Sequence, residues 1–80
     1  SAAVFILLKR GLYPWQNQAG DLEIGVIRAK SYTDCLDKLY KHLIDKYDKL
    51  DDTLSYEDLL EQLGDLYGVY IGDIYDITEF

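Results

Sequence analysis

The chain has 80 residues, eight of them Lys or Arg and fifteen Asp or Glu, so its net charge is −7 with the single His neutral. This length fits one small domain, residues 1–80, and an apolar content of 49% excludes a disordered acidic tail. One cysteine excludes an internal disulfide and a cysteine-rich zinc site, and we expect a cytoplasmic protein. The longest apolar run, residues 2–8, is far shorter than the about 20 residues of a membrane helix.

The first third of the chain predicts two strands with a loop between them. Residues 2–10 are apolar on both faces at their centre, which is typical of a strand in the middle of a sheet. Residues 11–20 are expected to form a loop that carries Pro14 and Trp15. In residues 21–30 a period of two places Leu22, Ile24 and Val26 on one face, which predicts a half-buried strand.

A helix of about 17 residues is expected to follow. Ser31 and Asp34 have the spacing of a capping box, in which each side chain accepts a hydrogen bond from a free N–H group of the first helical turn. Apolar residues then recur with the helical period and charged residues fill the opposite face. The predicted buried face consists of Cys35, Leu36, Leu39, Tyr40, Leu43, Ile44 and Tyr47.

The rest of the chain predicts a shorter helix and a strand. Ser55 is a helix-start signal, and the helix is expected to end near Gly68 with its apolar face formed by Leu59, Leu60, Leu63 and Leu66. Residues 69–80 are β-branched and aromatic, and Gly72-Asp73 within them predicts either a hairpin turn or a bulge. The predicted order is β-β-α-α-β. We expect an α+β domain with a mixed sheet of three strands, or four if Gly72-Asp73 turns the chain, and with both helices on one face.

Charge is distributed unevenly along the chain. Residues 1–50 hold all eight basic and six acidic residues, net +2, whereas residues 51–80 hold nine acidic and no basic residues, net −9. On the second predicted helix, Glu57, Glu61 and Asp65 follow one another at four-residue spacing with Asp58 beside them. This face is an ordinary solvated surface, a surface that meets a basic partner protein, such as one that handles nucleic acid, or a surface that binds cations. The acidic balance argues against direct binding of nucleic acid.

Catalysis finds little support in the sequence. Cys35 and His42 are seven residues apart on one helix, about 10.5 Å along its axis, which excludes a shared metal ion and a nucleophile–base pair. Phosphate-binding glycine loops and the nucleophile motif GxSxG are absent from the sequence. We therefore expect no enzyme activity, no metal site and no cofactor.

Aromatic residues are the second candidate for binding. Trp15 is expected either to cover a sheet edge or to stand out as an interface anchor, and Tyr70 and Tyr75 are candidates for an exposed face of the tail strand. Tyrosines on the helices are expected to pack in the core. The predicted partner-binding residues are Glu57, Asp58, Glu61, Asp65, Asp73, Asp76 and Trp15.

Two functions follow from these patterns. The first is a non-catalytic module that docks its acidic last third on a basic protein surface; in charge and size alone the chain resembles small acidic inhibitors that imitate nucleic acid. The second is a structural module that forms a homodimer when its tail strand pairs edge to edge with a second copy.

Overall fold

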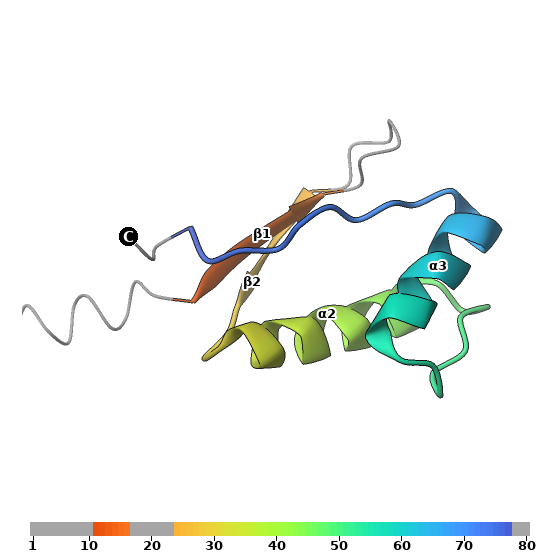
Figure 1. The fold of residues 1–80 in the computed structure, drawn as a ribbon, viewed down its shortest axis with the longest axis horizontal. Helices are drawn as coiled ribbons and strands as arrows, with labels where there is room; N and C mark the ends of the chain where they lie inside the picture. Colours follow the sequence, from red (N-terminus) through yellow and green to blue (C-terminus); the bar gives the residue numbers. More distant parts are fainter. Residues whose placement is uncertain (1–10, 17–23, 78–80) are drawn as a thin grey trace, which may run out of the picture.

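The protein has a small α+β fold. The structure, a computed structural model, describes residues 11–16 and 24–77. In these ranges the elements are β1 (Leu12–Gln16), β2 (Ile24–Arg28), α2 (Tyr32–Lys46) and α3 (Tyr56–Tyr67), and an extended C-terminal segment follows (Figure 1). The predicted class and the two helices are confirmed. The expected strand at 2–10 lies outside the described residues, and the described sheet has two antiparallel strands, so the predicted three or four strands are not confirmed.

The prediction of a loop over residues 11–20 is wrong at 12–16. These residues form β1, which pairs antiparallel with β2 from Leu12↔Arg28 to Gln16↔Ile24. The strand forms because Tyr13 and Trp15 point to one face and are both buried, and aromatic residues suit a half-buried pleated surface. Pro14 lies between them. Residues 17–20 of the expected loop are outside the described ranges.

β2 ends at Arg28, two residues before the predicted end at residue 30, and residues 21–23 lie outside the described ranges. Where the side chains of β2 are described, the buried face is the opposite of the predicted one. Val26 is 59% exposed, whereas Ile27 packs against both hydrophobic clusters of the core. The cause is the indole of Trp15, which crosses β2 at Gly25: a Cβ at this glycine would lie 2.4 Å from the indole nitrogen. Because the side-chain period is two, a strand that turns position 25 towards the indole turns Val26 to solvent.

α2 has the predicted start and the predicted buried face. The Ser31 hydroxyl accepts a hydrogen bond from the backbone N–H of Asp34 at 3.1 Å. The carboxylate of Asp34 accepts a hydrogen bond from the N–H of Lys30 at 3.0 Å, one residue before the N–H of the cap residue, Ser31, which a capping box uses. The fully buried residues of α2 are Cys35, Leu39 and Leu43.

α3 also begins and ends as predicted. Ser55 caps it by accepting a hydrogen bond from the N–H of Asp58 at 3.2 Å, and Gly68 ends it in the left-handed conformation, φ 66°, that glycine adopts without strain. Leu59 and Leu63 are fully buried, but Leu66 in the last turn is 51% exposed. The predicted apolar face is therefore wrong at Leu66.

One hydrophobic cluster joins the sheet to both helices. Its buried members are Trp15, Leu39, Leu43, Leu50, Leu59, Leu63 and Val69. A smaller cluster of Tyr13, Ala29 and Cys35 lies near the start of α2. Of the tyrosines expected to pack, Tyr32 is 51% exposed, and four others contact the main cluster, half-buried: Tyr40, Tyr47, Tyr56 and Tyr67.

The C-terminal segment runs back along β1 without forming a regular strand (Figure 1). Ile71 makes an isolated bridge, and the N–H of Ile77 donates to the carbonyl of Leu12 at 3.0 Å. Backbone groups of alternate residues point to the same strand edge, so Pro14 faces the segment as Leu12 does. Because proline has no N–H to donate, this edge of β1 lacks a donor that regular strand pairing would use. Gly72-Asp73 does not form the predicted hairpin turn, because the chain continues past it without reversing. It is not a bulge either, because a bulge interrupts a strand pair and residues 72–76 belong to no strand.

Candidate protein-binding surface

The carboxylates predicted to bind a partner lie on the solvent side of α3. Burial of Leu59 and Leu63 fixes which side of the helix meets the core, so positions 57, 61 and 65 face away from it. Glu57, Asp58, Glu61 and Asp65 are all exposed, and we call these four residues the acidic surface. Three of them repeat at four-residue intervals, a rise of about 6 Å each.

Among the residues that the structure describes, no cation pairs with the acidic surface. α3 contains no Lys or Arg. In the part of the chain that the structure describes, none of the four side chains makes an ion pair or a hydrogen bond. Like charges at i,i+4 repel one another on a helix, so α3 keeps this arrangement at some cost in stability. A cationic partner would remove that repulsion.

The outer face of α2 is different. Asp34 and Lys38 form an ion pair at 3.3 Å, and the Lys38 ammonium also donates to the carbonyl of Arg28 at 2.9 Å. The hydrogen bond from the N–H of Lys30 and the charge of Lys38 lower the pKa of Asp34. Acidic and basic residues therefore balance one another on α2, whereas α3 presents one sign only.

The two tail carboxylates have different surroundings. Asp73 is exposed, as a partner-binding residue would be. Asp76 is half-buried, and its carboxylate accepts hydrogen bonds from the N–H groups of Gly11 at 2.8 Å and Leu12 at 3.3 Å. Asp76 thus ties the tail to the start of β1. Sequence reasoning missed this role, since nothing local to Asp76 identifies a partner 65 residues away.

Trp15 neither stands out as an anchor nor covers a sheet edge from a loop: it lies on β1 and packs in the core. It is 7% exposed in the main cluster, and its ring lies 5.4 Å from the ring of His42 at an interplanar angle of 58°. So little exposed area cannot anchor an interface, and Trp15 is not part of the candidate surface. Up to residue 77, where the description of the tail ends, Tyr70 and Tyr75 are its exposed aromatic residues, at 55% and 63%.

The groups considered for chemistry are separated. Cys35 is fully buried in the smaller cluster, and burial raises the pKa of its thiol, which keeps it protonated and a poor nucleophile. His42 is exposed on α2 beside Trp15. Among the described residues, no group of three or more His, Cys, Asp or Glu could hold a metal ion.

Comparison of the chain with protein-family models, with curated proteins and with solved structures finds no match. Within residues 11–16 and 24–77, neither helix is long and apolar enough to cross a membrane.

Proposed function

We propose that the chain is a non-catalytic protein-binding module that docks its acidic last third on a basic surface of a partner protein. The partner we expect is a cytoplasmic protein that handles nucleic acid, which the module inhibits or regulates. The observation that carries the proposal is the acidic surface: four exposed carboxylates on a helix that has no basic residue. Asp73 extends the same charge along the tail.

A surface that carries one sign of charge can attract and select a partner of opposite charge. Complementary charge steers association and selects partners, and it makes the association sensitive to salt. A basic groove on the partner would gain binding free energy from each carboxylate. Binding would also relieve the repulsion between the carboxylates of α3. A neutral or acidic partner would leave that repulsion in place.

The test is affinity capture from a cell lysate at low and at high salt, with the bound proteins identified by mass spectrometry. The test variant combines Glu57→Lys, Glu61→Lys and Asp65→Lys. A matched control combines Asp21→Lys, Glu23→Lys and Asp37→Lys, which change the net charge equally but precede the acidic third. We expect one nucleic-acid-handling protein that is lost at high salt and with the test variant, and kept with the control. An empty capture, or a partner that binds the test variant unchanged, contradicts the proposal.

A second function, self-association, is favoured by the outer face of the tail. Residues 73, 75 and 77 are exposed, whereas 72, 74 and 76 are half-buried. This alternation presents Tyr75 and Ile77, 63% and 45% exposed, on one face of the tail, beside the backbone edge at which a second copy could pair. Light scattering at high protein concentration tests this function: a dimer that Tyr75→Glu dissociates supports it, and a monomer contradicts it.

A further inference from the structure

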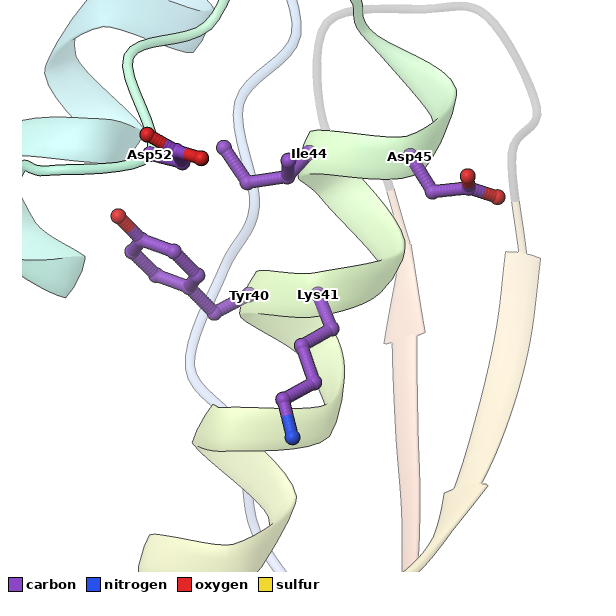
Figure 2. Close-up of a pocket in the computed structure, with 5 residues that line it drawn as sticks. All are labelled: Tyr40, Lys41, Ile44, Asp45 and Asp52. Carbon is purple, nitrogen blue, oxygen red and sulfur yellow. The ribbon is translucent and has the colours of Figure 1, made fainter.

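A hollow of about 330 Å³ opens on α2, beside the loop that joins α2 to α3 (Figure 2). Its lining combines an aromatic ring, an aliphatic side chain, two carboxylates and one ammonium: Tyr40, Ile44, Asp45, Asp52 and Lys41. These residues are separate from the acidic surface of α3. Ligand pockets usually occupy about 300–1,000 Å³, and this hollow, at the lower end of that range, has room for one side chain of a partner.

One wall of the hollow is apolar and held in place. The hydroxyl of Tyr40 donates to the carbonyl of Leu54 at 2.7 Å, which ties the ring to the loop. Figure 2 shows Ile44 beside this ring, with the carboxylate of Asp52 above the hydroxyl end of Tyr40. A planar group that enters here can therefore contact ring and aliphatic carbons while its edge reaches a carboxylate.

The rim of the hollow is negative. Asp45 projects from α2 on the far side of Ile44 from Asp52, and the Lys41 chain extends along the helix away from Asp52 (Figure 2). Burial raises the pKa of Tyr40, and the negative charges of Asp52 and Asp51 raise it further. The Tyr40 side of the hollow therefore lies in the negative field of Asp51 and Asp52. Asp52 is exposed and makes no hydrogen bond or ion pair within the described residues.

We infer that this hollow receives an arginine side chain of the partner protein. A guanidinium is flat, stacks on an aromatic ring, and donates several hydrogen bonds from its edge to carboxylates. An ammonium offers a hydrated point charge with no flat face, and a neutral side chain would desolvate Asp52 without pairing it. The inference rests on the proposed function and adds arginine as the residue that the partner contributes at this second contact.

The test is a titration of the ¹⁵N-labelled chain, followed by NMR, with the capped tripeptide Gly-Arg-Gly. Matched peptides carry lysine or the neutral arginine analogue citrulline in the central position. We expect saturable shifts at Tyr40, Ile44 and Asp52, with a dissociation constant on the order of tens of millimolar for one stacked ion pair. The lysine peptide should bind more weakly, and the citrulline peptide should produce no saturable shift.

Two variants of equal charge change locate the binding. Asp52→Asn should weaken the arginine peptide about two- to fivefold, the value of one exposed ion pair, whereas Glu61→Gln on α3 should leave its affinity unchanged. Absence of saturable shifts, shifts centred on α3, equal binding of the three peptides, or equal effects of the two variants would each overturn the inference. Because the titration uses no partner, its failure leaves the capture experiment on the acidic surface as an independent test.

Discussion

At the scale of single residues, Asp76 has the most informative position. Its carboxylate accepts hydrogen bonds from the N–H groups of Gly11 and Leu12, at the edge of β1 where Pro14 cannot donate. We expect Asp76→Ala to lower the free energy of unfolding by about 1–3 kcal/mol, because two partly buried donors lose their acceptor. Urea unfolding of the variant measures this loss.

Asp73→Ala is the matched control for that change. Asp73 lies three residues earlier in the same segment and is exposed, so its removal should change stability by less than about 0.5 kcal/mol. If the two variants unfold at the same urea concentration, Asp76 does not hold the tail as we infer.

Residue positions also separate what the sequence predicts from what it cannot. The buried leucines of both helices follow from a period that the sequence carries locally. The reversal of β2 does not, because it depends on Trp15, which reaches Gly25 from another strand. With Trp15 predicted in a loop, alternation alone placed Val26 inside, and it is exposed.

At the scale of elements, α3 retains a repulsion that α2 does not have. Glu61 has Glu57 four residues before it and Asp65 four residues after it. We expect Glu61→Gln to stabilise the protein by about 0.4–1 kcal/mol at low salt, since it removes two unfavourable i,i+4 pairs. Unfolding in urea at two salt concentrations measures the gain, which should shrink as salt screens the charges.

Asp37→Asn on α2 is the control for that gain, because it removes the same charge from a helix of mixed sign. Asp37 precedes Lys41 by four residues, an attractive pair, so its neutralisation should not stabilise the protein. Equal stabilisation by Asp37→Asn and Glu61→Gln would show that the loss of stability comes from the net charge of the protein, and not from the row of carboxylates on α3.

The helices were predictable and the sheet was only partly so, for a physical reason. Helix caps and faces depend on residues within a few positions, such as Ser55 and Asp58. Strand pairing depends on distant partners, and the tail meets β1 through Ile77 and Leu12. The acidic surface was predictable because all four of its carboxylates share one helix, whereas the role of Asp76 was not. The hollow was not predictable either, since α2 and the loop form it together.

At the scale of the whole molecule, stability against base depends on the junction between the two helices. Tyr56 begins α3 and is half-buried. Burial, and to a lesser extent Tyr32, Cys35 and Glu57, raise the pKa of Tyr56 to about 12 from 10.0. Between these two values the unfolded chain releases the phenol proton and the folded chain keeps it. The free energy of unfolding is therefore unaffected by Tyr56 below pH 10 and falls as the pH rises towards 12.

We expect this decrease to be on the order of 2 kcal/mol across the window, but other groups titrate there as well. Lysines lose their charge and exposed tyrosines gain one, so a chain that is already at −7 becomes more negative and repels itself more strongly. Tyr56→Phe separates the two effects, because it keeps the ring and removes one titrating group. Unfolding in urea at pH 9, 10, 11 and 12 should show a steeper loss for the native chain than for Tyr56→Phe above pH 10. Parallel profiles would mean that general charge repulsion, and not the half-buried phenol of Tyr56, causes the loss of stability in base.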